Sequence, residues 1–181
     1  QIKRNNQLLD SLLIFRMTIF NALAAAGAVW AYQMGFVTDM FGNDSSYMTY
    51  VAAALFLWGT FSCFSRSRKV SALLDQLKRG ITPEFNGAKF TEKSAHLDDI
   101  GDLIVVIGLT GTAIGVVMML HSFSAGSLTD PAKVVETATA LGDGLGTAFR
   151  STIVSSILWM AHIVNLRMLK TATVLLTEDS Q

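Results

Sequence analysis

The chain has 181 residues, of which 51% are apolar and only 15% are charged, whereas soluble proteins average about 25% charged residues. Its 14 basic and 14 acidic residues cancel, so the whole-chain charge does not favour a nucleic-acid partner. A single cysteine, Cys63, and three scattered histidines exclude a disulfide framework and a local Cys/His metal cluster. The mean hydropathy of +0.43 indicates a membrane protein.

Four apolar stretches approach the ~20 residues that a helix needs to cross ~30 Å of hydrocarbon. They cover approximately residues 12–32, 48–64, 101–120 and 145–166. If all four were buried helices of a soluble domain, the rest of the chain would be too short to cover them with polar residues. The sequence therefore predicts an all-α, polytopic membrane protein with four transmembrane helices.

The distribution of basic residues predicts the orientation of these spans. Lysine and arginine gather before span one, between spans two and three, and after span four. By contrast, segment 33–47 has no basic residue and segment 121–144 has only Lys133. Because cytoplasmic loops carry the excess of lysine and arginine, we expect both termini and the central loop to be cytoplasmic.

The spans divide the chain into three predicted parts. Residues 1–64 form an N-terminal helical hairpin of two spans, residues 65–99 a cytoplasmic segment, and residues 100–181 a helical pair with an external connection and a cytoplasmic tail. From Arg66 to Arg79, leucine and valine side chains share one helical stripe among basic residues. This pattern indicates either an interfacial helix or, as the preferred interpretation, a cytoplasmic extension of span two.

The fourth span is predicted to start well before its apolar stretch. The run Thr129-Asp130-Pro131 is typical of a helix start, with a capping carboxylate before proline at the first helical position. Span four is then the lower part of one helix beginning near Pro131, and its glycines at 142, 144 and 146 predict a loosened stretch.

Spans three and four carry polar and small residues at helical spacing. In span four a polar side chain recurs every four residues, at Asp143, Thr147, Ser151 and Ser155. Span three contains the glycines Gly108, Gly111 and Gly115. One interpretation is close helix packing, since small residues let backbones approach. The other is a polar lumen; spacing alone favours packing.

The same two stretches resemble a known family. Residues 108–115 (GLTGTAIG) look like the Gly-Leu-x-Gly-Thr-x-x-Gly signature of the MotA/TolQ/ExbB proton-channel family. Residues 144–152 (GLGTAFRST) resemble the family's next helix, and the short external connection between the two stretches also fits. The resemblance covers residues 100–168, and before residue 100 only the topology matches.

This resemblance implies an ion-driven motor subunit in the bacterial inner membrane. Five chains would form a ring around two copies of a single-span partner of the MotB/TolR/ExbD kind, whose aspartate carries H⁺ or Na⁺. Helices three and four would line the ring lumen, with Thr112 and Thr152 on the ion path and Thr147 and Ser151 beside them. Apart from that ion, no cofactor or metal is implied, and the expected partners are these chains and membrane lipid, without nucleic acid.

Arg150 departs from the family pattern, in which its position is ordinarily apolar. An arginine at mid-span costs roughly 2.5–3.5 kcal/mol on insertion scales, so we expect it to reach the outer interface or to pair with an acid. Asp143 is the best candidate in this chain for a possible charge pair between subunits. Alternatively, five Arg150 side chains would line the lumen and repel cations, and the ring would be a non-conducting structural scaffold.

Other polar residues of the spans are assigned to packing rather than to chemistry. Asn21 and Arg16 in span one are expected to satisfy neighbouring helices or to extend to the membrane surface. The sequence has no paired intramembrane carboxylates, histidine cluster or nucleophile with a base. We therefore expect a protein that is not an enzyme.

Overall fold

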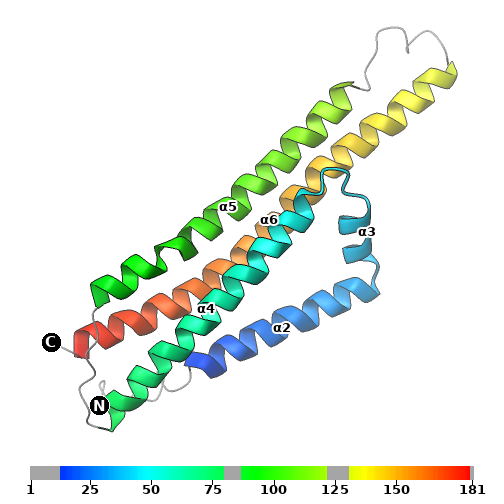
Figure 1. Cartoon of the computed structure of the whole chain (residues 1–181). Coiled ribbons are helices and arrows are strands. Elements are labelled where there is room, and N and C mark those ends of the chain that lie inside the picture. Colours follow the sequence, from blue (N-terminus) through cyan, green and yellow to red (C-terminus); the bar gives the residue numbers. More distant parts are fainter. Residues whose placement is uncertain (1–12, 80–86, 122–130, 180–181) are drawn as a thin grey trace. The chain divides into compact units, whose positions relative to one another are not determined.

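The computed structural model describes residues 13–79, 87–121 and 131–179, which are helical apart from short turns (Figure 1). Within these residues the chain forms one short helix, α3 (Phe36–Gly42), and four long ones. The long helices are α2 (Leu13–Gln33), α4 (Met48–Lys78), α5 (Gly87–His121) and α6 (Pro131–Asp179). The predicted all-α fold class is confirmed.

Each of the four long helices is long and apolar enough to cross a membrane. The most hydrophobic window, in α5, has a mean hydropathy of 2.5, yet only 22% of it is buried within the chain. In α2 the buried share is 11%. Soluble proteins do not leave contiguous apolar surfaces of this extent in water. The exposed apolar helices are those of a multi-pass membrane protein.

Two helices extend well beyond the predicted spans. Helix α4 continues without interruption to Lys78, so the stretch from Arg66 is an extension of span two and not a separate interfacial helix. The predicted cytoplasmic segment 65–99 accordingly consists largely of the adjoining ends of α4 and α5.

Helix α6 begins at Pro131, as predicted, and is 49 residues long. At 1.5 Å per residue it is about 74 Å long, more than twice the hydrocarbon thickness. The loosening predicted at residues 142–146 is not seen, because this stretch is helical throughout. The predicted capping residues Thr129 and Asp130 lie outside the described residues.

A compact turn joins α2, α3 and α4. Gly35 has a φ of +78°, a left-handed conformation that glycine adopts without steric cost, and it separates α2 from α3. The Asp44 carboxylate accepts hydrogen bonds from the amide and hydroxyl of Ser46 and from the amide of Thr49 in the first turn of α4. Burial by itself would raise the pKa of Asp44, but the hydrogen bonds together outweigh it and lower the pKa below its ordinary value.

The chain forms two compact units, to which each long helix contributes. The first unit is drawn from Gln1–Val29, Phe56–Gly101 and Met160–Gln181, and the second from Trp30–Leu55 and Asp102–Trp159. The three predicted parts are consecutive in the chain, whereas each packed unit combines segments that are far apart in the sequence.

Buried polar side chains pack inside the first unit. Asn21 of α2 and Asn165 of α6 hydrogen-bond through their side-chain amides, with donor–acceptor distances of 2.9 and 3.2 Å. The expectation that Asn21 satisfies a neighbouring helix is confirmed. Ser67 and Cys63 of α4 are both fully buried, and the Ser67 hydroxyl donates to the sulfur of Met17.

His162 of α6 is also fully buried in the first unit. Its Nε2 atom lies 2.8 Å from the carbonyl oxygen of Leu97, whereas Nδ1 has no hydrogen-bond partner among the described residues. Gly59 of α4 makes room for the imidazole, because a Cβ atom there would lie 2.8 Å from His162 Cε1. The histidine thus acts as a packed polar side chain that joins helices α4, α5 and α6.

Candidate functional site

The backbones of α5 and α6 touch within the second unit. A Cβ atom at Gly115 would lie 2.5 Å from the amide nitrogen of Ala148 and 2.6 Å from the carbonyl oxygen of Gly144. Real Cβ atoms essentially never come closer than 3.0 Å to such atoms, so only glycine fits this crossing. The close approach brings the polar residues of the two helices within reach of one another.

The other two predicted packing glycines lie on the same face of α5. A Cβ atom at Gly108 would lie 2.6 Å from Cβ of Ser155, and one at Gly111 would lie 2.6 Å from Cβ of Ser151. The small-residue face of span three is therefore occupied by α6 of the same chain. Its glycines pack as helix-contact residues should, but they give no separate argument for contacts between subunits.

Thr112 of α5 and Thr152 of α6 meet across this contact and hydrogen-bond through their hydroxyls. The Thr112 hydroxyl is also 3.0 Å from the Gly108 carbonyl oxygen and 3.4 Å from that of Ala148. The Thr152 hydroxyl is 3.1 Å from the same Ala148 oxygen. Both side chains are half-buried, so the pair keeps an accessible side. Two residues 40 positions apart thus form one polar spot between two apolar helices.

The other two predicted pathway residues are buried. Thr147 is 1% exposed and Ser151 is 0% exposed, and the Ser151 hydroxyl donates to the Ala148 carbonyl oxygen at 3.1 Å. Their face of α6 is turned towards α5, where Ser151 fills the space left by Gly111. In this chain the polar stripe of span four therefore serves packing at these two positions, whereas the pair of Thr112 and Thr152 remains accessible.

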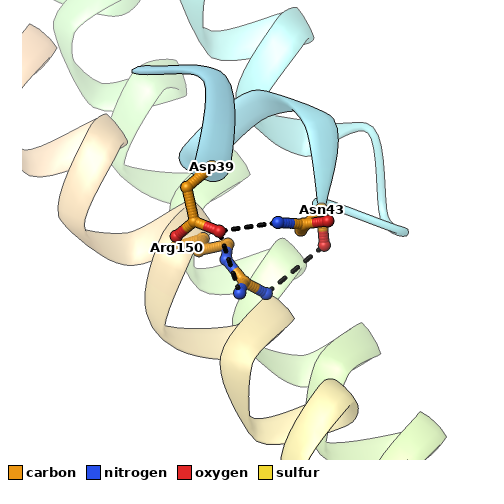
Figure 2. Close-up of polar contacts among 3 residues, drawn as sticks. All are labelled: Asp39, Asn43 and Arg150. Carbon is orange, nitrogen blue, oxygen red and sulfur yellow. Dashed lines mark hydrogen bonds and ion pairs between the residues drawn. The ribbon is translucent and has the colours of Figure 1, made fainter. Parts of the chain in front are cut away.

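Arg150 lies against α3 (Figure 2). Its Nη2 atom is 3.7 Å from Asp39 Oδ1, and its Nη1 atom donates to the Asn43 carbonyl oxygen at 3.4 Å. The Asn43 side-chain amide also donates to Asp39 Oδ1, at 2.6 Å. Within one chain the ion pair of Arg150 is thus with Asp39. The pair with Asp143, expected between subunits, stays a prediction. The guanidinium connects α6 to the turn between α2 and α4.

Asp39 and Asn43 were not among the predicted site residues. They are more than 100 positions from Arg150 in the sequence, and no local spacing connects them. One signal was present: segment 33–47 contains two acids and no base. Span four contains an arginine without a partner, and the segment predicted to be external contains acids without a base. These complementary charges could have indicated the pair.

The described residues hold no group of three or more histidine, cysteine or acidic side chains that could bind a metal ion. Comparisons with known proteins find no matching family model, no matching curated protein and no matching solved structure. The function of the chain is therefore inferred from its own residues and from the motifs that they form.

Proposed function

We propose that this chain is the ring-forming subunit of a proton- or sodium-driven energy transducer in a bacterial inner membrane, with both termini cytoplasmic. It would act with a single-span partner dimer whose aspartate carries the ion, as the resemblance to the MotA/TolQ/ExbB family implies. The observation that carries the proposal is the hydroxyl pair of Thr112 and Thr152. These are the two positions that the resemblance assigns to the ion path.

The chemistry of the pair suits a carboxylate that passes through the membrane interior. An ionised carboxylate there is costly unless hydrogen-bond donors or water meet it. A threonine hydroxyl donates and accepts without adding a competing charge. The proton of Thr112 has three acceptors within reach, namely the carbonyl oxygens of Gly108 and Ala148 and the hydroxyl of Thr152. Rotation of the hydroxyl towards a carboxylate therefore exchanges one acceptor for another.

The surroundings of Arg150 favour a conducting ring over a structural scaffold. The scaffold interpretation depends on five guanidinium groups that line the lumen and repel cations. Here the guanidinium is bound to Asp39 and to the Asn43 carbonyl oxygen. It also lies two residues before Thr152, which rotates it by about 200° around the helix from that threonine. An arginine held in this way has no need to face the ion path.

The test measures ion flux through the assembled complex in proteoliposomes. Valine keeps the shape of threonine and deletes the hydroxyl, so the double variant Thr112→Val with Thr152→Val should assemble but lose ion-driven flux. Thr110→Val is the matched control, because Thr110 is an exposed residue of the same helix whose hydroxyl, among the described residues, bonds only the carbonyl oxygen one turn back. Unchanged flux in the double variant would show that the threonines serve only packing.

Assembly is tested separately by native mass spectrometry in mild detergent. The proposal expects a homopentamer that retains a dimer of the single-span partner when the two are produced together. A stable monomer or dimer of this chain would contradict the ring. A pentamer that binds no partner and conducts no cation would instead support the structural scaffold.

A further inference from the structure

An open cavity of about 270 Å³ lies in the first unit between the beginning of α2 and the C-terminal half of α6. Arg16 of α2 and Arg167 of α6 both line it. The rest of its lining is mostly apolar and includes Leu13, Met168 and Ala172. The cavity therefore combines two cationic groups with a hydrophobic wall.

Its two arginines lack a counter-charge among the described residues. Neither forms an ion pair there, and no acidic side chain contributes to the described lining. By contrast Lys170, one turn after Arg167, is paired with Asp98 at 2.7 Å. Two guanidinium groups that share one cavity repel each other. An anion bound between them would remove this repulsion and receive bidentate hydrogen bonds.

The position of the cavity relative to the membrane surface indicates which anion it binds. Arg16 lies near the start of the first predicted span, and Arg167 directly follows the fourth predicted span. In the proposed orientation both reach the cytoplasmic membrane surface, where basic pockets between helices bind anionic lipid headgroups. A free phosphate would use the two arginines but would gain nothing from the apolar lining, whereas a phospholipid places its glycerol and acyl carbons there.

We propose that this cavity binds an anionic phospholipid, with Arg16 and Arg167 contacting its phosphate and the apolar lining contacting its upper acyl chain. The lipid would join α2 to α6 within the first unit. The site is separate from the pair of Thr112 and Thr152, which belongs to the second unit, and it does not depend on whether the chain conducts ions.

Native mass spectrometry of the full-length protein tests the site, with phosphatidylglycerol, phosphatidylcholine of the same acyl chains, or inorganic phosphate added. The wild-type protein should retain phosphatidylglycerol in preference to phosphatidylcholine. Since each basic residue near the surface contributes a factor of about five in affinity for anionic lipid, Arg16→Gln and Arg167→Gln should each weaken retention about fivefold. The double variant should lose the preference.

Two further variants and one competition experiment complete the test. Arg68→Gln makes the same change at an exposed arginine of α4 that does not line the cavity, and it should retain the wild-type preference. Replacing both arginines of the cavity with lysine keeps the charges and should preserve most of it. A wild-type preference in the double glutamine variant would overturn the proposal. So would an equal loss in Arg68→Gln, or displacement of the lipid by millimolar inorganic phosphate.

Discussion

From the contact between α5 and α6 we predict that Gly115→Ala destabilises the protein. The added Cβ atom would lie 2.5 Å from the Ala148 nitrogen and 2.6 Å from the Gly144 oxygen. Both obstacles are backbone atoms, so no side-chain rotation relieves the overlap. To reach even the 3.0 Å limit of real Cβ contacts, the two helices must separate by about half an ångström.

The size of the effect follows from two opposing terms. Overpacking of a closely fitted contact costs typically 1–3 kcal/mol, and the rigid obstacle places Gly115→Ala near ~3 kcal/mol. Replacing glycine with alanine inside a helix returns about 1 kcal/mol. The net destabilisation should therefore be about 2 kcal/mol. Gly142→Ala is the matched control, because a Cβ atom there meets nothing within 4 Å, and it should stabilise the protein by about 1 kcal/mol.

Reversible unfolding in mixed detergent and SDS micelles, followed by circular dichroism, measures both variants. The helix-propensity term is common to them, so their difference of about 3 kcal/mol isolates the packing of α5 on α6. Equal stabilities for Gly115→Ala and Gly142→Ala would mean that these helices do not touch at Gly115.

Three further predictions concern an ion pair, a buried carboxylate and the topology. The side chain of Arg150 is 22% exposed and that of Asp39 is 52% exposed, so their pair should show a coupling of about 0.5 kcal/mol in a double-mutant cycle. Arg150→Leu should not make reconstituted rings leak cations; a leak would place the guanidinium on the ion path. Because the pKa of Asp44 is lowered, its carboxylate stabilises the folded state above its ordinary pKa of 3.8, and this contribution is lost as the pH falls through the lowered value. Asp44→Asn should therefore cost about 1 kcal/mol at pH 7, with a penalty that shrinks below about pH 4 in pH-dependent unfolding; a constant penalty would contradict the role of the charge. For the topology, a cysteine introduced at Ser45 should react with an impermeant reagent added outside intact cells and one at Ser71 should not; labelling at Ser71 would reverse the assignment.

The sequence was sufficient to predict the features that depend on local composition. Four apolar stretches are visible as windows of high hydropathy. Pro131 marks the start of α6, because a helix tolerates proline only in its first turn. The amphipathic stripe after Arg66 likewise indicates that α4 extends beyond its span. Helix α3 was not predicted, because seven residues are too few for a reliable periodicity.

The arrangement of the site depends on contacts that no spacing specifies. A four-residue repeat places Thr147 and Ser151 on one face of a helix, but it does not show whether that face meets a lumen or another helix. The answer depends on the glycines of α5, which leave room for the Ser151 side chain. In the same way, the partner of Arg150 is set by a turn more than 100 residues away, so its identification requires the three-dimensional structure.

The rate at which Cys63 is chemically modified reports on the opening of the first unit. It is the only thiol of the chain and is fully buried on α4, and alkylating reagents need both access and the thiolate. Modification must therefore wait for a local or global opening, and every 1.4 kcal/mol of opening free energy slows it tenfold when opening and closing are fast. A ligand that binds only the closed form adds to that free energy. A phospholipid held by Arg16 and Arg167 should thus protect a cysteine that it does not touch.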